Sequence, residues 1–124
     1  MPTPEQMEAA VHAYVAAFAA GDPEQAVAIF AVDAVVEAPI GTPPKIGHAA
    51  IREFYQASMA TGAKLVLDGP VRVAAAHAAF AFHVPLHFDG KDMEIHVIDT
   101  FAFDENGKVK EMKAYFGPGN MIAG

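Results

Sequence analysis

Two stretches of alternating residue character, 80–88 and 91–103, flank the dipeptide Asp89-Gly90. Asp-Gly between two such stretches is a strong signal for a two-residue β-hairpin turn. When pairs are counted outward from this turn, Phe80 stands opposite Asp99, and the apolar faces of the two predicted strands coincide. The pattern therefore predicts a long hairpin with a fixed register, around which the rest of the chain must pack.

Asp99 is a carboxylic acid on the apolar face of this predicted hairpin. Strand alternation places it on the same face as Val97 and Phe101. A charged carboxylate in such surroundings is costly, so the group must be paired, hydrogen-bonded or protonated. Most buried acids are structural, whereas an acid on a concave apolar face is a candidate functional group.

The segment before the hairpin is predicted to be mainly helical. Thr3-Pro4-Glu5-Gln6 has the pattern of an N-cap, a proline at the first helical position and a capping-box glutamine, and Gly21 ends the helix. Tyr14 lies on the apolar stripe of this helix, where its hydroxyl needs a hydrogen-bond partner. The other predicted elements are a short helix from Asp22 through Phe30, a strand over 33–38, a loop over 39–44, a helix from about Gly47 to Gly62, one or two strands over 65–75, a strand over 108–116 and a flexible tail at 117–119.

Composition and charge narrow the class of protein. The 124 residues are 53% hydrophobic, which predicts one domain, 1–124, with a single core. A net charge of −7 with eight scattered Lys and Arg residues argues against nucleic acid and anionic membranes as partners. The absence of cysteine excludes disulfides, thiolate catalysis and cysteine zinc sites. No membrane span or signal peptide is recognisable, so we expect a soluble, cytoplasmic protein.

Helices followed by an antiparallel sheet predict an α+β fold in which three N-terminal helices pack on a strongly curved, mostly antiparallel sheet. The inner wall of that sheet is large for a short chain, and a pocket for a flat apolar ligand is a reasonable expectation. We predict that this wall comprises Phe80, Phe82, Val84, Leu86, Met93, Ile95, Val97, Met112, Ala114 and Phe116.

Two further groups of residues resemble sites but lack the partners that a site needs. His83 and His96 face each other on the opposite side of the sheet, near Asp92 and Glu94, but no third ligand stands at matched depth, so no metal site is expected. Ser58 is the one serine of the chain, and no acid–base pair can be placed beside it, which argues against a hydrolase triad.

The chain resembles bacterial Δ5-3-ketosteroid isomerase over nearly its whole length, and more broadly the nuclear-transport-factor-two-like and polyketide-cyclase-like proteins. The pairing of Tyr14 with Asp99 is the specific part of this resemblance. The resemblance implies a cone-shaped fold, a homodimer, a deep apolar pocket for a 3-ketosteroid or a phenolic steroid analogue, and no cofactor. Its supporting segments are Val36-Glu37-Ala38-Pro39-Ile40-Gly41, Gly21-Asp22, Gly41-Thr42-Pro43-Pro44, Phe54-Tyr55, Gly69-Pro70-Val71-Arg72, Val97-Ile98-Asp99, Phe103-Asp104-Glu105-Asn106-Gly107 and Met112-Lys113-Ala114-Tyr115.

The resemblance also assigns roles to residues. Tyr14 and a protonated Asp99 would form an oxyanion hole for the steroid C3 oxygen, and an acid kept neutral by an apolar site is a known feature of this family. Tyr55 would support Tyr14 by hydrogen bonding, and Phe30 stands where some members carry a further tyrosine. The residues that match the steroid-contacting wall are Phe54, Phe82, Val84, Leu86, Val97, Met112, Ala114 and Phe116.

Ala38 departs from the family pattern, in which an aspartate at this position shuttles a proton between C4 and C6. Alanine can neither take nor return a proton, and alternation turns Glu37 to the opposite face. One explanation is an isomerase that has lost its general base, by deliberate substitution, and is strongly impaired. The other is a natural relative that binds an apolar ligand, catalyses a different reaction or serves as an interaction module. Retention of both Tyr14 and Asp99 favours the first explanation, because a buried acid is costly without a use.

Overall fold

The computed structural model describes residues 1–123 of the chain. Within these residues the chain forms three α-helices, one 3-10 helix and eight β-strands. In chain order they are α1 (Pro4–Ala20), α2 (Pro23–Val27), β1 (Phe30–Glu37), β2 (Lys45–Ile46), α3 (Gly47–Ala60), β3 (Val66–Leu67), β4 (Arg72–Ala74), β5 (His77–Phe88), β6 (Lys91–Phe103), β7 (Val109–Tyr115), η1 (Pro118–Asn120) and β8 (Met121–Ala123).

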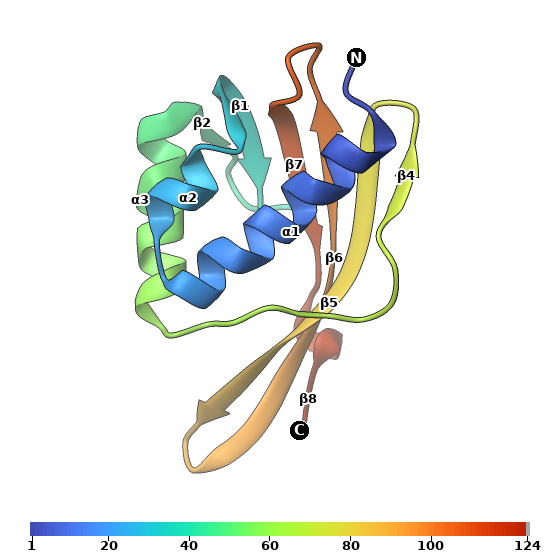
Figure 1. The fold of residues 1–124 in the computed structure, drawn as a ribbon. Coiled ribbons are helices and arrows are strands. Elements are labelled where there is room, and N and C mark those ends of the chain that lie inside the picture. Colours follow the sequence, from blue (N-terminus) through green and yellow to red (C-terminus); the bar gives the residue numbers. More distant parts are fainter. Residues whose placement is uncertain (124) are drawn as a thin grey trace.

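The strands form one mixed sheet with the order β2-β1-β7-β6-β5-β3, to which β4 adds beside β5 and β8 beside β6. The β1–β7 pair is parallel, and the other pairs are antiparallel. The sheet curves around α1, which crosses its concave side, while α2 and α3 lie beside α1 (Figure 1). The predicted α+β fold with a curved, mostly antiparallel sheet is therefore confirmed.

The central hairpin has the register that the sequence predicts. Phe80 pairs with Asp99 and the turn lies at Asp89-Gly90, where the backbone φ angles are +53° and +74°. Two positive φ angles are required in a type I′ turn, and Asp-Gly accepts them readily. The β5–β6 hairpin continues past the helices at the lower end of the molecule (Figure 1).

The first helix is also as predicted. The Thr3 hydroxyl accepts a hydrogen bond from the Gln6 backbone N–H, and the Gln6 side chain accepts one from the Thr3 N–H. At the other end Gly21 has a φ of +63°, which ends the helix in a left-handed conformation. These two caps determine where α1 begins and ends. They therefore help to set the place at which Tyr14 packs against the sheet.

Two local predictions are wrong. The second helix ends at Val27, and Phe30 instead begins β1, where it pairs with Val109 of β7. The tail predicted after Phe116 is ordered as η1 and β8, and β8 pairs with residues 93–95 of β6. In both places a sheet edge offers unpaired backbone groups, and pairing with that edge outweighs the local sequence signal.

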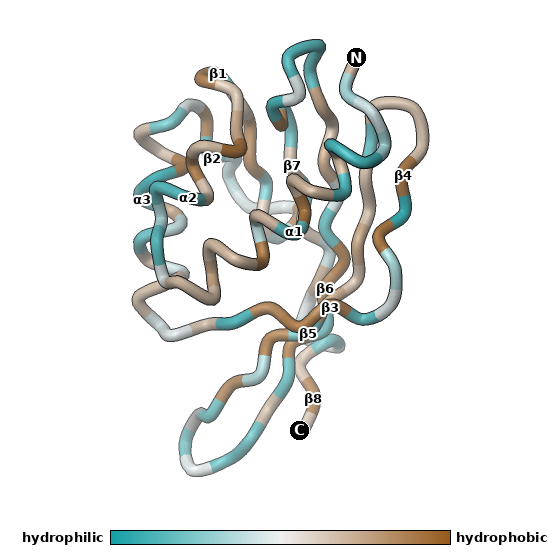
Figure 2. The backbone as a smooth tube through the Cα atoms, viewed as in Figure 1, coloured by the Kyte–Doolittle hydropathy of each residue, from teal (hydrophilic) through white to brown (hydrophobic). Residues whose placement is uncertain are grey.

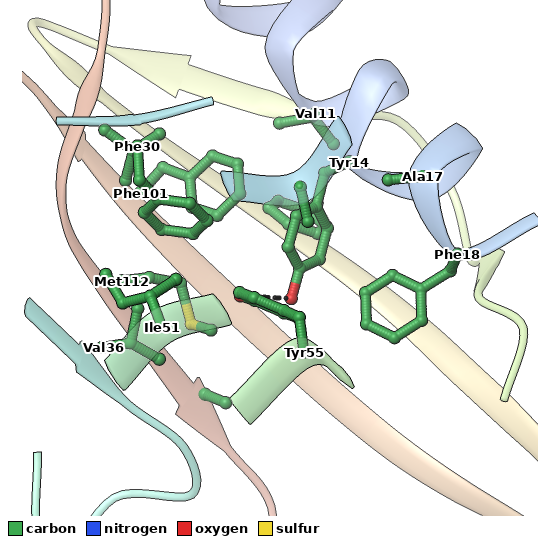
Figure 3. Packing of buried hydrophobic residues seen from close by; sticks show 14 of the residues in the cluster. Val11, Tyr14, Ala17, Phe18, Phe30, Val36, Ile51, Tyr55, Phe101 and Met112 are labelled. Atoms are coloured by element: carbon green, nitrogen blue, oxygen red, sulfur yellow. Dashed lines mark hydrogen bonds between the residues drawn. The ribbon is translucent and has the colours of Figure 1, made fainter. Parts of the chain in front are cut away.

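The core lies between the helices and the concave side of the sheet. Hydrophobic residues recur along the helices and the strands of the sheet that border this space (Figure 2). Aromatic rings fill much of it, including Tyr14, Tyr55, Phe30 and Phe101, all at most 3% exposed (Figure 3). Among residues 1–123, no helix combines the length and the hydropathy needed to cross a bilayer.

Candidate active site

An apolar cavity of about 360 Å³ opens between the helices and the concave side of the sheet. Its walls come from α1, α3, the segment after α3, the end of β1 and the three strands β5, β6 and β7. The lining residues are Tyr14, Phe18, Ala38, Phe54, Ser58, Thr61, Ala63, Leu65, Phe82, Val84, Leu86, Ile95, Val97, Asp99, Met112, Ala114 and Phe116. Such a cavity, mostly apolar with a few polar groups, has the character of a small-molecule site.

Asp99 is the buried acid of this cavity. The residue is 2% exposed, and within residues 1–123 its buried Oδ1 atom has no hydrogen-bond partner. Burial raises the pKa of Asp99 well above that of a free aspartate, since desolvation disfavours the charged form. Burial thus favours the neutral carboxylic acid, the form of Asp99 that has a proton to donate. A buried polar atom without a partner is a position that a ligand can satisfy.

Tyr14 reaches the same cavity from α1. Its hydroxyl lies 3.0 Å from the hydroxyl of Tyr55 on α3, within hydrogen-bonding distance (Figure 3). Burial, followed by the nearby Tyr55 and Asp99, raises the pKa of Tyr14 well above that of a free tyrosine. Tyr14 therefore stays protonated and, like Asp99, is a hydrogen-bond donor.

Aromatic neighbours fix the position of the Tyr14 ring. The ring centroids of Phe18, Tyr55, Phe80 and Phe101 lie 5.3, 5.7, 6.1 and 5.3 Å away, all in edge-to-face arrangements. This geometry is favoured by the quadrupoles of the rings. These contacts on several sides restrict the position of the Tyr14 ring and therefore of its hydroxyl.

The hydrogen-bonded pair of tyrosines in the core consists of Tyr14 and Tyr55. Phe30 packs against Tyr55 with the ring centroids 5.8 Å apart, at the position where the resemblance suggests a further tyrosine in some relatives. Phenylalanine offers no hydroxyl, so Tyr55 has the hydroxyl of Tyr14 as its hydrogen-bond partner.

Ala38 directly follows β1 and lines the cavity, whereas its neighbour Glu37, the last residue of β1, does not. The Glu37 carboxylate accepts a hydrogen bond from the Gly41 backbone N–H at 2.8 Å, which holds it against the following loop. The opposite orientation predicted for Glu37 is confirmed. At this point of the cavity wall, a ligand would therefore meet the methyl group of Ala38.

The residues predicted as site residues come together. The three predicted catalytic positions and all eight residues of the predicted steroid-contacting wall line the cavity. Tyr55 is not a lining residue, but its hydroxyl contacts that of Tyr14. Of the ten residues predicted on the inner face of the sheet, eight line the cavity, while Phe80, which is 1% exposed, packs in the core and Met93 is not among the lining residues. The predicted set of site residues lacks Phe18, Ser58, Thr61, Ala63, Leu65 and Ile95.

Helical spacing is a signal for some of these additional residues. Phe18 follows Tyr14 by four positions, and Ser58 follows Phe54 by four, so each lies on the same helix face as a predicted site residue. Ala63 and Leu65 belong to an irregular segment, for which no periodicity is available. Ile95 belongs to the predicted inner wall but not to the predicted site.

The outer face of the sheet carries the predicted histidine pair. The rings of His83 and His96 stack with centroids 5.8 Å apart, and their nitrogens contact Asp68 at 2.9 Å and Glu94 at 3.0 Å respectively. Among residues 1–123, no three His, Asp or Glu side chains gather closely enough to hold a metal ion.

Comparison of the sequence with known proteins assigns the chain to a family. The family model of the SnoaL-like domain matches residues 11–112. The chain belongs to the SnoaL-like family. A similar protein, the steroid Delta-isomerase of Nocardioides simplex, is 38% identical over 118 residues, which cover 94% of either chain. The resemblance to steroid isomerases is therefore confirmed.

The fold itself is shared with a solved structure of lower sequence identity. The epoxide hydrolase/cyclase-like enzyme SalBIII, described with a role in pyran ring formation in the polyether salinomycin, superimposes with a TM-score of 0.91. The two chains are 20% identical and each is covered completely. This likeness supports the assignment of the fold alone.

Proposed function

We propose that this chain is a steroid Δ-isomerase scaffold that converts Δ5-3-ketosteroids to Δ4-3-ketosteroids through a dienolate. The reaction moves a proton from C4 to C6 while the double bond shifts from C5–C6 to C4–C5. The observation that carries the proposal is the burial of Asp99, with its Oδ1 atom unpartnered, in an apolar cavity that Tyr14 also lines. The relationship to a steroid Delta-isomerase supports it.

The two donors act on the C3 oxygen of the substrate. Negative charge develops on this oxygen as the dienolate forms, and hydrogen bonds from Tyr14 and Asp99 become stronger with that charge. Donors fixed in an apolar site are effective because they need no reorganisation during the reaction. Either hydroxyl can donate in the Tyr14–Tyr55 hydrogen bond; we assign Tyr55 as the donor, which leaves the Tyr14 proton for the ligand.

With alanine at position 38, the site lacks the carboxylate that would carry the proton from C4 to C6. We propose that the scaffold is a base-deleted isomerase whose activity is reduced by at least about 10²–10⁴-fold. Glu37 is no substitute, since it is bound to the loop at Gly41. Alanine at this position also favours the second candidate, a relative that binds an apolar ligand without isomerising it.

A binding titration with a phenolic steroid, estradiol, tests the site. The phenol resembles the dienolate at the oxygen that Tyr14 and Asp99 would contact. We expect saturable one-to-one binding that Asp99→Leu weakens by about 10-fold or more, the scale of a hydrogen bond to a charged oxygen. Absence of saturable binding would identify an interaction module and reject the proposal.

We further propose that the chain folds as one domain, 1–124, and forms a homodimer through the outer face of the sheet. Ile98 and Tyr115 are cross-strand neighbours there and are 49% and 47% exposed, next to the stacked His83 and His96. Exposed apolar side chains grouped with a polar rim are typical of an association surface. Light scattering should give a dimer mass for the unsubstituted chain with Ala38, called the wild type below, and a monomer mass for Ile98→Glu; a monomeric wild type contradicts this proposal.

A further inference from the structure

Ser58 is the one serine of the chain, and it lies on the cavity face of α3. It follows Phe54 by four residues and Tyr55 by three, so the three side chains share one side of the helix. Its side chain is half-buried. The isomerase mechanism does not use its hydroxyl.

The hydroxyl of Ser58 has unused capacity as a hydrogen-bond acceptor. Its Oγ donates to the Phe54 carbonyl oxygen at 3.0 Å. A hydroxyl oxygen has one proton to donate and two lone pairs that accept. The proton is therefore engaged by the helix, while the lone pairs remain available to a group inside the cavity.

Thr61, the other hydroxyl on this wall, is a contrasting case. Its Oγ1 donates to the Ser58 carbonyl oxygen at 2.6 Å and accepts from the Ala63 backbone N–H at 3.3 Å. The oxygen of Thr61 is thus engaged in both directions by the end of the helix. Of these two hydroxyls, Ser58 is the better placed to bind a ligand group.

The position of Ser58 suits a second contact on a ligand anchored at Tyr14. The rise of an α-helix is about 1.5 Å per residue, so Ser58 lies roughly 4.5 Å farther along the axis of α3 than Tyr55. Tyr55 marks the anchored end, because its hydroxyl contacts that of Tyr14. Because Tyr14 and Ser58 line the same cavity, a fused-ring ligand anchored at Tyr14 can present part of its ring system to Ser58.

We propose that Ser58 is a specificity-determining residue: its Oγ accepts a hydrogen bond from a hydroxyl group on the ring system of the ligand. The cavity then prefers hydroxylated fused-ring phenols and ketones to their oxidised or deoxygenated counterparts. This inference rests on the proposed function, since it assumes that the other end of the ligand is held by Tyr14 and Asp99.

The preference follows from the hydrogen bonds that the Ser58 hydroxyl already makes and those that it can still accept. A ligand hydroxyl adds a hydrogen bond and breaks none, because the lone pairs of Ser58 are free. A ligand ketone has no proton to give, so it gains a bond only if the Ser58 proton leaves the Phe54 carbonyl. A deoxygenated ligand leaves Ser58 unchanged and gains nothing.

The test is a matrix of dissociation constants. The parent probe is 17-deoxyestrone, a phenolic steroid without a second oxygen, and its derivatives carry a hydroxyl or a ketone at C6, C11 or C17. Each is titrated against the wild type, Ser58→Ala and, as a matched control on the same wall, Thr61→Val. The dissociation constant of the parent measures binding at the Tyr14 end. The ratio of each derivative's dissociation constant to that of the parent measures the contribution of Ser58.

In the wild type we expect at least one hydroxyl derivative to bind about threefold to tenfold more tightly than its ketone, the scale of one hydrogen bond. Ser58→Ala should abolish that gain and Thr61→Val should retain it, while the parent binds all three proteins. A gain that survives in Ser58→Ala, no gain at any position, or an equal loss for all ligands including the parent would overturn the inference. A wild type that does not bind the parent contradicts the proposed function and this inference together.

Discussion

The hydroxyl oxygens of Tyr14 and Tyr55 lie 3.0 Å apart inside the aromatic core. Either hydroxyl can be the donor in this hydrogen bond. When a ligand oxygen is present, the arrangement in which Tyr55 donates to Tyr14 is favoured, because it frees the Tyr14 proton for that oxygen. The pair therefore works as a relay of two donors, and the two tyrosines are expected to differ in importance.

Replacement of each tyrosine by phenylalanine measures this difference. Tyr14→Phe removes the direct donor and should weaken the binding of a phenolate ligand by about 10- to 100-fold, as for a hydrogen bond to a charged group. Tyr55→Phe removes the supporting donor and should cost about twofold to tenfold. Dissociation constants from fluorescence titration check both values. A larger effect for Tyr55→Phe would contradict the assigned order.

The burial of Asp99 predicts a pH-dependent stability. Burial raises its pKa in the folded chain above the value of about 3.9 in the unfolded chain. Between these two pKa values the folded chain holds a proton that the unfolded chain has lost, so stability falls as the pH rises. This contribution is complete below the unfolded pKa and has a slope of up to about 1.4 kcal/mol per pH unit.

Asp99→Asn should remove that slope, because an amide of similar shape does not titrate. The measurement is the free energy of unfolding in urea for both proteins from pH 4 to pH 8. The wild type should lose stability relative to Asp99→Asn as the pH rises. Parallel curves for the two proteins would show that Asp99 is charged in the folded state and is not the neutral donor that the oxyanion site requires.

Ala114 offers a test of the cavity itself. It pairs with Asp99 across the sheet and is 4% exposed, with its side chain toward the cavity. Ala114→Phe should fill space beside the donors and lower estradiol affinity by more than about 10-fold, the effect of a blocked site. The matched control is Lys113→Phe, which puts the same ring on the other face of β7. Equal affinities for the two variants would place the ligand elsewhere.

The space beside Ala38 predicts chemical rescue. A small carboxylate such as acetate fits where the missing side chain would lie, and it supplies the base that alanine lacks. Added acetate should raise the isomerisation rate of the wild type in proportion to its concentration, at constant ionic strength. The rate of Ala38→Asp should not respond. A flat response of the wild type would count against a vacant base position.

The sequence predicted the parts of the site that depend on regular spacing. Alternation in the central hairpin placed Asp99 on the apolar face opposite Phe80, and the Asp-Gly turn fixed the register. Helical spacing placed Tyr14 inward. These predictions are correct because a one-residue error in a strand would turn every side chain to the wrong face.

Other features depend on contacts between distant segments. Phe30 reads as the end of a helix, yet its backbone pairs with β7, which lies about eighty residues later. The wall formed by Ala63 and Leu65 comes from an irregular segment, whose path is determined by packing rather than by periodicity. The strand β8 exists because β6 extends beyond β7 and leaves an edge to pair with.

The central claim is that Tyr14 and Asp99 form a competent oxyanion site that lacks only a base at Ala38. The most direct test compares the Δ5-to-Δ4 isomerisation of a 3-ketosteroid by the wild type, Ala38→Asp and Glu37→Gln. We predict that Ala38→Asp is faster than the wild type by about 10²-fold or more, and that Glu37→Gln matches the wild type. An inert Ala38→Asp protein that still folds and binds estradiol would contradict the claim.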